Sequence, residues 1–214
     1  MPASLELKAM VREQLVRGGV RSRRVLGAFL RVDRARFVPP DLSRQAYANG
    51  PLAIGAGQTI SQPLMVADML EALDLHRGQR LLEVGAGSGY ALALAAALGA
   101  TAYGVERIPE LARAIPGRFA ALGLPEPRLR VADGTLGWPD QAPFARILVS
   151  AACPKIPPPL LDQLDEEGVL VAPVGDAGGQ VLHRVARRGG GFRTDAGIPC
   201  IFVPLRGRYG FAGR

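Results

Sequence analysis

The sequence is poor in residues that crosslink a chain or bind a metal. Its 214 residues include two cysteines, Cys153 and Cys200, and two histidines, His76 and His183. Neither cysteine has a partner at metal-ligand spacing, and two cysteines do not make a disulfide scaffold. We therefore expect no bound metal, and we expect reduced cysteines that serve as small core residues.

Long apolar segments are also missing. The chain has no run of about 18 uncharged apolar residues, which predicts no membrane span. Charged residues interrupt residues 1–15, where a secretory signal peptide would need a continuous apolar stretch. We expect a cytoplasmic monomer that does not bind membranes.

Positive charge is concentrated near the start of the chain. The net charge is +7, and residues 1–47 hold ten lysines and arginines against four acids, a net charge of +6. Such a segment could meet nucleic acid or an acidic substrate, or it could be a solvated helical face. No aromatic residues alternate with these arginines, as a surface for single-stranded nucleic acid would require. The solvated face is therefore favoured, and a nucleic-acid partner is not expected.

The hydrophobic pattern changes at about residue 60. Before it, periodic apolar residues predict helices over 4–17 and 22–32, and the glycine-rich stretch 47–61 predicts a loop. A helix begins at Pro63 and runs to about Leu73. We expect residues 1–60 to form an N-terminal extension and residues 61–214 to form one compact domain.

From Arg80 onward, short apolar runs alternate with helical segments, which predicts a parallel sheet covered by helices on both faces. The predicted helices are 89–98, 109–122 and 157–164. The predicted strands are 80–84, 101–105, 128–132, 144–150, 168–174, a hairpin of 180–187 with 191–194, and a last strand at 200–205.

The segment LLEVGAGSGY joins the first of these strands to a helix through Gly85, Gly87 and Gly89. Glycine permits positive φ and lets a ligand approach the backbone. Open parallel sheets bind ligands at the carboxyl ends of their strands. The spacing is GxGxG, not the GxGxxG of dinucleotide-binding proteins, and alone it fits either a nucleotide-type site or a plain structural turn.

Acidic residues end the next two predicted strands. Glu106 follows the second strand, where a carboxylate can accept hydrogen bonds from ribose hydroxyls. Asp133 follows the third, where a carboxylate can face an adenine amino group, although a surface acid and an Asp-Gly turn give the same pattern. Acids without a phosphate cradle suit S-adenosylmethionine, which is a cationic sulfonium without phosphate.

A series of short motifs resembles the protein-L-isoaspartate (D-aspartate) O-methyltransferase family from about residue 11 to the C-terminus. The most specific is GQTISQP (57–63), which methyltransferases in general lack, whereas the glycine motif indicates only a class I methyltransferase. The other motifs are YANGPLAIGAG (47–57), LEVGAGSGY (82–90), Glu106-Arg107, Asp133-Gly134, GWP (137–139), APF (142–144), Ile156-Pro157, VAPVG (171–175) and FVPL (202–205).

The resemblance implies both a fold and an activity. The fold is a Rossmann-like seven-stranded α/β sheet, mostly parallel with an antiparallel C-terminal hairpin, with helices on both faces and an N-terminal helical extension. The implied enzyme transfers a methyl group from S-adenosyl-L-methionine to the α-carboxylate of L-isoaspartyl residues in damaged proteins, yielding S-adenosyl-L-homocysteine. The ester then closes to a succinimide. Two alternatives stay open: a methyltransferase dedicated to aspartates of one partner, and a non-catalytic S-adenosylmethionine-binding protein.

The resemblance also implies the site residues. The catalytic-site serine of the family falls on Ser61. The implied cofactor-binding residues are Glu83, Gly85, Gly87, Ser88, Gly89, Glu106, Arg107, Asp133 and Gly134. The implied substrate-binding residues are Thr59, Ile60, Gln62, Val203 and Pro204. Three positions depart from the family pattern: Ala132 and Ala145, expected on the cofactor side, and Leu64, expected beside the substrate loop.

Methyl transfer to a carboxylate requires position more than proton transfer. A carboxyl group has a pKa near 4, so the nucleophile is already ionised at neutral pH and no general base is required. The two histidines consequently need no role. The enzyme must hold the carboxylate oxygen about 3 Å from the methyl carbon and in line with sulfur, and we expect a hydrogen bond from Ser61 to orient that carboxylate.

Overall fold

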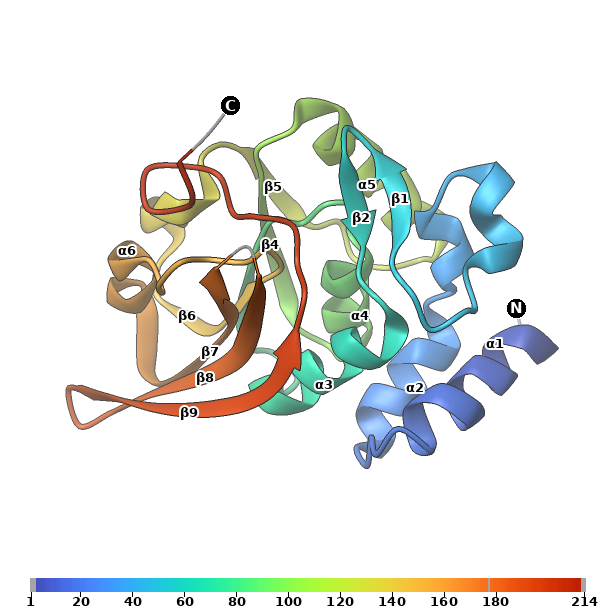
Figure 1. Cartoon of the computed structure of the whole chain (residues 1–214), viewed down its shortest axis with the longest axis horizontal. Coiled ribbons are helices and arrows are strands. Elements are labelled where there is room, and N and C mark those ends of the chain that lie inside the picture. Colours follow the sequence, from blue (N-terminus) through green and yellow to red (C-terminus); the bar gives the residue numbers. More distant parts are fainter. Residues whose placement is uncertain (1–2, 177, 213–214) are drawn as a thin grey trace.

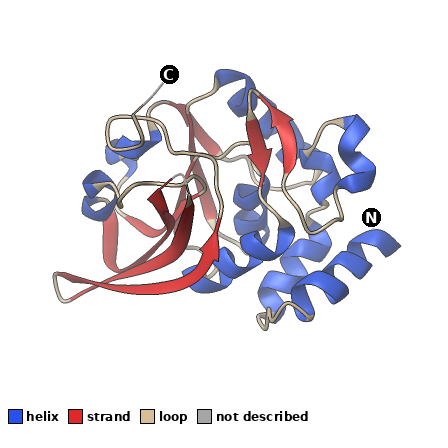
Figure 2. Cartoon of the chain, viewed as in Figure 1, coloured by secondary structure: helices blue, strands red, loops and turns tan. Residues whose placement is uncertain are grey.

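The computed structural model describes residues 3–176 and 178–212, which contain a seven-stranded sheet with helices on both faces (Figure 1, Figure 2). The strand order is β5-β4-β3-β6-β7-β8-β9. Neighbours from β5 to β7 are parallel, and β7, β8 and β9 pair antiparallel. These findings confirm the predicted fold class. The strands are β3 (Arg80–Val84), β4 (Thr101–Glu106), β5 (Arg128–Val131), β6 (Phe144–Val149), β7 (Leu164–Asp176), β8 (Gly179–Arg188) and β9 (Gly191–Cys200).

Alternate residues of the central strands pack into two separate cores. Leu81 and Leu148 lie in one, and Leu82 and Ile147 lie in the other, because successive side chains of a strand point to opposite faces. The helices on the first face are α3 (Pro63–Leu73), α4 (Tyr90–Ala97) and α5 (Pro109–Ala121), and α6 (Pro158–Asp162) covers the second. The strand order changes direction between β3 and β6. Because β-α-β crossovers are right-handed, the helices that accompany the two directions cover opposite faces of the sheet.

The N-terminal helices belong to the first of these cores. Helix α1 (Leu5–Met10) continues as a π-helical segment (Val11–Val16), and α2 (Arg23–Arg31) follows. Ser4 and Ser22 cap α1 and α2, each accepting a hydrogen bond from the backbone N–H three residues ahead. The ring of Phe29 in α2 packs edge-on against Tyr90 in α4, with centroids 6.0 Å apart. The extension is thus held to the sheet layer by buried apolar contacts.

Residues 47–61 contain a small antiparallel hairpin, β1 (Leu52–Gly55) and β2 (Gln58–Ile60), where the sequence predicted a loop. Figure 1 shows the hairpin to the right of the central strands. Its turn is built from residues with positive φ, namely Gly55, Ala56 and Gly57. The glycine content that suggested an irregular loop instead supplies this tight turn.

The predicted last strand at 200–205 is wrong. Strand β9 ends at Cys200, and the chain then leaves the sheet edge and runs to the end of β6. There Ala152 N–H donates to the carbonyl of Val203 at 2.8 Å, and Leu205 N–H donates to the carbonyl of Ala152 at 2.7 Å. Pro204 between them has no N–H to donate to a ladder, so only an isolated bridge forms.

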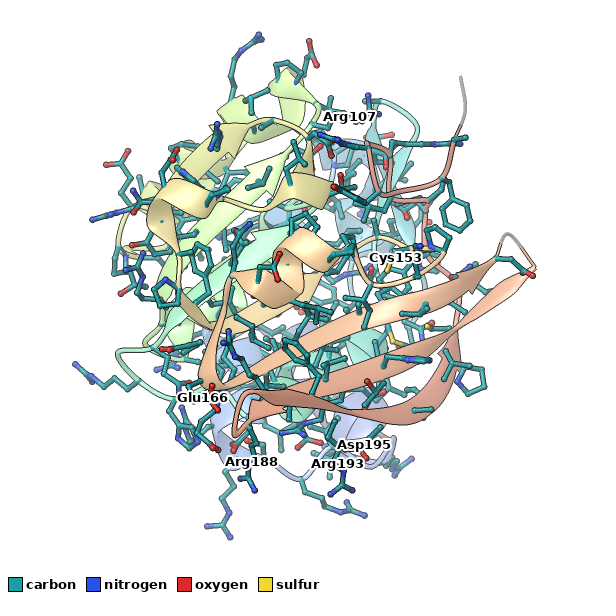
Figure 3. The ribbon with its side chains drawn as sticks, turned by 90° about the vertical axis from the view of Figure 1, so that its left-hand side faces the viewer. Arg107, Cys153, Glu166, Arg188, Arg193 and Asp195 are labelled. Atoms are coloured by element: carbon teal, nitrogen blue, oxygen red, sulfur yellow. The ribbon has the colours of Figure 1, made fainter. Side chains whose placement is uncertain are left out.

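Strand β9 is an exposed edge strand that carries charge. Arg193 and Asp195 form an ion pair at 3.1 Å, and Arg188 pairs with Glu167 at 2.9 Å near the β8–β9 turn. Figure 3 shows Arg188, Arg193 and Asp195 at the opposite end of the molecule from Arg107. Charged side chains on an edge strand oppose pairing with a second chain.

Two kinds of feature are absent from the described residues. No helix among them has the length and apolar character needed to cross a membrane. Within residues 3–176 and 178–212, no three His, Cys, Asp or Glu side chains are grouped so that they could hold a metal ion.

The shared core predicts that the N-terminal helices unfold together with the sheet. Phe29→Ala should lower the free energy of unfolding by about 3–5 kcal/mol, because Phe29 is fully buried against Tyr90. Urea denaturation followed by circular dichroism should give one transition for the wild type and the variant. Leu30→Ala is the matched control, since Leu30 is 36% exposed. An early transition confined to residues 1–60 would contradict the shared core.

Candidate active site

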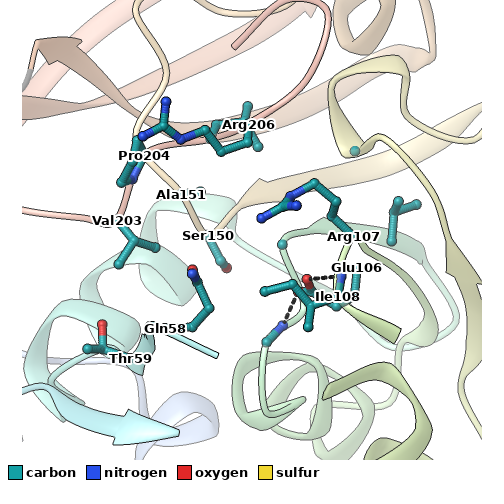
Figure 4. Close-up of a pocket in the computed structure, with 16 residues that line it drawn as sticks. Gln58, Thr59, Glu106, Arg107, Ile108, Ser150, Ala151, Val203, Pro204 and Arg206 are labelled. Atoms are coloured by element: carbon teal, nitrogen blue, oxygen red, sulfur yellow. Dashed lines mark hydrogen bonds between the residues drawn. The ribbon is translucent and has the colours of Figure 1, made fainter. Parts of the chain in front are cut away.

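The predicted site residues gather at the carboxyl ends of β3, β4 and β6, where the strand order reverses. Three cavities meet there and share Thr59 and Ser150 in their walls. The glycine-turn cavity, of about 320 Å³, is drawn in Figure 4 and includes Gly85, Gly87, Glu106 and Arg107. The hairpin pocket, of about 400 Å³, includes Pro51, Ser61, Gln62, Met65, Cys200, Ile201 and Phe202. A small cavity of about 40 Å³ joins Ile60 and Ser61 to Glu83, Gly85, Gly87 and Ser88.

The glycine turn has the positive φ values that its sequence predicted. Gly85 and Gly87 have φ of +79° and +55°, and both line the cavity. Gly89 has φ of +83°, but it faces α5: a Cβ there would lie 2.8 Å from Ile115. Gly89 lines none of the three cavities, so it permits close packing of α4 against α5 instead of ligand contact.

Four backbone N–H groups of this turn already donate within the protein. Gly85 and Ala86 donate to the carbonyl of Val105 at 2.8 and 3.2 Å, and Gly89 donates to the carbonyl of Ala86 at 2.7 Å. Gly87 donates to Glu106 Oε2 at 2.8 Å. The turn therefore does not present a row of free donors to an anion, unlike a phosphate-binding loop.

Glu106 is buried in the wall of the glycine-turn cavity, 6% exposed. Its Oε1 accepts from the N–H of Ile108 at 2.9 Å, while Oε2 accepts from Gly87 (Figure 4). Each carboxylate oxygen can accept a second hydrogen bond. The geometry thus orients Glu106 and leaves it able to accept hydroxyl donors from a ligand.

Glu83 lies at the floor of the small cavity and is 1% exposed. Its Oε1 accepts from Ser150 Oγ at 2.6 Å, and Oε2 has no hydrogen-bond partner within the described residues. Burial raises the pKa of Glu83 to about 8, and the charge of Glu106 adds to this shift. The hydrogen bond from Ser150 and the nearby backbone N–H of Leu92 oppose it. An unpaired carboxyl oxygen in such a cavity fits a cationic group of a ligand.

Asp133 does not line any of the three cavities, although its neighbour Gly134 does. Its Oδ1 accepts from the N–H and the hydroxyl of Thr135 at 2.9 and 2.7 Å, and its Oδ2 accepts from the N–H of Arg208 at 2.8 Å. Burial alone would raise the pKa of Asp133, but these hydrogen bonds outweigh it and the pKa is lowered. Asp133 anchors the segment 203–211, which we call the C-terminal strap.

The C-terminal strap forms one wall of the site. Val203 lines both the glycine-turn cavity and the hairpin pocket, and Pro204 and Arg206 line the former. Gly207 lies against Asp133 so closely that a Cβ would be 1.9 Å from Oδ1. Figure 4 shows Val203, Pro204 and Arg206 across the cavity from Glu106 and Ile108.

Ser61 lines the hairpin pocket and the small cavity together with Thr59. Helix α3 has Gln62 at its N-cap position, without a side-chain capping bond. Among the described residues no group hydrogen-bonds to the Ser61 hydroxyl. The hydroxyl is therefore available to a ligand between the hairpin and the glycine turn.

Sequence reasoning did not identify Ser150 or Arg206. Ser150 lines all three cavities and directly follows β6. Its position after a central parallel strand was the available signal, but it carries no motif. Arg206 directly follows residues 200–205, which were predicted to be a strand of the sheet, so its position in a cavity wall could not be inferred.

The three departures from the family pattern lie outside the cavity walls. Ala145 is near the start of β6, at the opposite end from Ser150, so its expected place on the cofactor side is wrong. Ala132 donates to the carbonyl of Glu106 at 3.2 Å. The methyl groups of Leu64 pack over Gly18 in the N-terminal extension.

Part of the basic N-terminal segment faces away from this site. Arg23, Arg24 and Arg31 line a broad concavity of about 880 Å³ together with His76 and Arg77, which precede β3. This concavity lies at the amino ends of the parallel strands and shares no residue with the three cavities.

Comparisons with known proteins agree with this architecture. The model of the family described as protein-L-isoaspartate(D-aspartate) O-methyltransferase matches residues 6–210. The protein-L-isoaspartate O-methyltransferase of Methylorubrum populi is 52% identical over 205 residues, covering 95% of this chain and 96% of that protein. That of Syntrophotalea carbinolica is 44% identical over 212 residues, covering 99% and 98%.

A similar solved structure comes from Plasmodium falciparum. It is assigned as a protein-L-isoaspartate O-methyltransferase and contains S-adenosyl-L-homocysteine. It has a TM-score of 0.82 and 25% sequence identity, and the match covers 93% of this chain and 97% of that one.

The buried carboxyl of Glu83 predicts a pH-dependent stability. Its folded-state pKa of about 8 lies above the ordinary value of 4.5. As pH rises between these values the unfolded state ionises first, so the protein loses stability, and the loss is complete above about pH 8. Glu83→Gln should remove a loss on the order of 5 kcal/mol, measured by denaturant unfolding from about pH 5 to about pH 9. Glu126→Gln, at an exposed position, is the control, and parallel pH profiles for wild type and Glu83→Gln would contradict the assignment.

Proposed function

The chain belongs to the protein-L-isoaspartate(D-aspartate) O-methyltransferase family, and we propose that the glycine-turn cavity and the hairpin pocket hold its two substrates. The enzyme depends on S-adenosyl-L-methionine and methylates the α-carboxylate of L-isoaspartyl residues, which starts repair through a succinimide.

The observation that carries the proposal is the common wall of the two cavities. Thr59 and Ser150 belong to both. A ligand in the glycine-turn cavity and a peptide in the hairpin pocket would therefore meet where Ser61 lies. Direct transfer between two bound groups needs this adjacency, with the reacting atoms about 3–3.5 Å apart.

The chemistry of the glycine-turn cavity fits S-adenosylmethionine. Four N–H groups of the turn already donate within the protein, so the turn does not offer a phosphate a row of free donors, and Glu106 can accept hydrogen bonds from ribose hydroxyls. Glu83 has an unpaired buried oxygen that suits the ammonium or sulfonium side of the cofactor. Gly85, Gly87, Ser88, Arg107 and Gly134 complete the cofactor side of the proposal. Gly89 would act by letting α4 pack closely against α5, and Asp133 would act by holding the C-terminal strap.

The hairpin pocket suits the isoaspartyl residue. Thr59 and Gln62 form its wall with Ser61, and Ile60 lines the adjoining small cavity. The backbone around Val203 and Pro204 could pair with the substrate peptide as an added strand. The β1–β2 hairpin and the N-terminal helices, residues 1–60, would serve the substrate side, and residues 61–214 would carry the cofactor.

In the mechanism, the bound cofactor supplies the methyl group on a positively charged sulfur. The substrate carboxylate is ionised at neutral pH, so the protein needs no general base. The hydroxyl of Ser61 would donate a hydrogen bond to one carboxylate oxygen and leave the other free to react. Thr59 and Val203 would exclude water from the shared wall.

The proposal also includes a cytoplasmic monomer whose partners are isoaspartyl proteins and peptides. Two free, buried cysteines are compatible with a reducing compartment. The distance of the basic concavity from the cavities supports a solvated face instead of a nucleic-acid site.

The C-terminal strap provides a prediction about cofactor affinity. Gly207→Ala places a Cβ against Asp133 Oδ1 and should displace the strap, so that the dissociation constant for S-adenosylmethionine rises roughly tenfold or more. Calorimetry measures it. In an Asp133→Ala background the clash is gone and only the backbone strain at φ +150° remains, so Gly207→Ala should then have a smaller effect, as expected for two residues that share one contact.

Gly117→Ala is the control for the strap, because nothing lies within 4 Å of the added methyl. If Asp133→Ala weakens cofactor binding while Gly207→Ala alone has no effect, Asp133 contacts the cofactor directly and the strap role is wrong.

The role of Ser61 predicts a selective loss of turnover. Two matched peptides, one with L-isoaspartate and one with normal aspartate, are incubated with labelled S-adenosylmethionine. Base-labile label should appear only on the isoaspartyl peptide. Ser61→Ala should reduce kcat about 10- to 100-fold, the worth of one hydrogen bond to a charged group, with cofactor affinity nearly unchanged.

Each other outcome has a distinct meaning. Loss of cofactor binding in Ser61→Ala would contradict its assignment to the substrate side. If the wild type binds cofactor but labels neither peptide, a dedicated aspartate partner or a non-catalytic binding role replaces general repair.

A further inference from the structure

Arg34 is the largest fully buried side chain of the described residues, with 0% of its surface exposed. It lies in a short 3₁₀ turn (Arg34–Phe37) after α2. No carboxylate within the described residues lies within 4 Å of its guanidinium, whereas buried arginines are normally paired with acids. Burial lowers the pKa of Arg34, yet an arginine stays protonated at neutral pH. The core therefore contains a cation with no counter-ion in contact.

The guanidinium donates only to backbone carbonyls on either side of the β1–β2 hairpin. Its Nη1 donates to Ala46 at 2.7 Å, and its Nη2 donates to Gly50 at 2.9 Å and to Ser61 at 3.1 Å. Gly50 precedes the hairpin and Ser61 follows it. One nitrogen thus joins the two ends of the segment that carries Thr59 and Ile60 into the cavities.

The same charge lies close to the hydroxyl of Ser61. A serine hydroxyl is within about 4 Å of its own carbonyl oxygen by covalent geometry. A carboxylate that accepts from this hydroxyl would lie about 10 Å from the guanidinium. At an effective dielectric constant of about 20, a unit charge at that distance changes the binding of an opposite charge by roughly tenfold.

We propose that Arg34 is a positioning residue that closes the base of the hairpin beneath Ser61 and gives the hairpin pocket a positive potential selective for carboxylates. This inference rests on the proposed role of Ser61. The unpaired cation is retained because its counter-charge arrives with the substrate. A neutral side chain of similar length would make fewer hydrogen bonds to the two ends of the hairpin, and it would remove the preference for an anion.

The test compares two peptides that differ in charge at one group. One carries L-isoaspartate with a free α-carboxylate, and the other carries the corresponding α-carboxamide. Dissociation constants are measured by calorimetry with S-adenosylhomocysteine present, for the wild type, Arg34→Lys and Arg34→Met. The wild type should prefer the carboxylate, and Arg34→Met should reduce that preference roughly tenfold.

Arg34→Lys separates charge from geometry. It keeps the cation, so the preference for the carboxylate should persist. A lysine cannot reproduce the planar fork that reaches several carbonyls, so kcat should fall. Arg36→Met is the matched control, because Arg36 is exposed in the same turn, and it should leave both peptide affinities unchanged.

The outcomes that overturn the proposal do not depend on the stability of the variants. If the folded wild type binds carboxylate and carboxamide equally, the potential of the pocket is not selective, even when Arg34→Met fails to fold. If Arg34→Met weakened the binding of both peptides equally, the role of Arg34 would be structural only. Failure of the proposed function is distinguishable, because the wild type would then not methylate the isoaspartyl peptide at all.

Discussion

The carboxylate of Glu106 joins the turn after β3 to the turn after β4. Its two oxygens accept from Gly87 and Ile108 at 2.8 and 2.9 Å, and such charge-assisted bonds are stronger than neutral ones. The separation between the glycine turn and the start of α5 is therefore set before any ligand binds. The glycine-turn cavity lies in that separation, so its shape depends on this one side chain.

The same hydrogen bonds determine which ligand charge the cavity accepts. With the N–H groups of residues 85, 86, 87 and 89 already donating within the protein, the turn offers an anion few free donors. The carboxyl groups beside the turn offer acceptors: the second lone pairs of Glu106 and, in the adjoining small cavity, Oε2 of Glu83. A cation with hydroxyl groups satisfies both, which is the chemistry of S-adenosylmethionine. The GxGxG turn thus differs from a phosphate loop in where its donors are used.

The sequence predicted local elements well and long-range contacts poorly. Strand 80–84 and helix 63–73 have the predicted bounds, because their apolar periodicity and the proline at the helix start are local signals. The hairpin at 52–60 was missed because its pairing depends on positive φ at Ala56 and two glycines. Asp133 was expected to face the cofactor, but it is held by Thr135 and by Arg208, 75 residues away. Arg34 contacts residues up to 27 positions away along the chain, and no sequence motif predicts these contacts.

The placement of charge follows from the reaction. Methyl transfer from a sulfonium to a carboxylate turns two ions into two neutral groups, so any contact that stabilises either ion strongly also raises the barrier. Arg34 acts through a backbone carbonyl, without touching the carboxylate. Glu83, with a pKa of about 8, is mostly protonated at neutral pH before a cation arrives. Both groups act on the reacting ions from a distance, and the Ser61 hydroxyl, which has no hydrogen-bond partner among the described residues, can orient the reacting carboxylate.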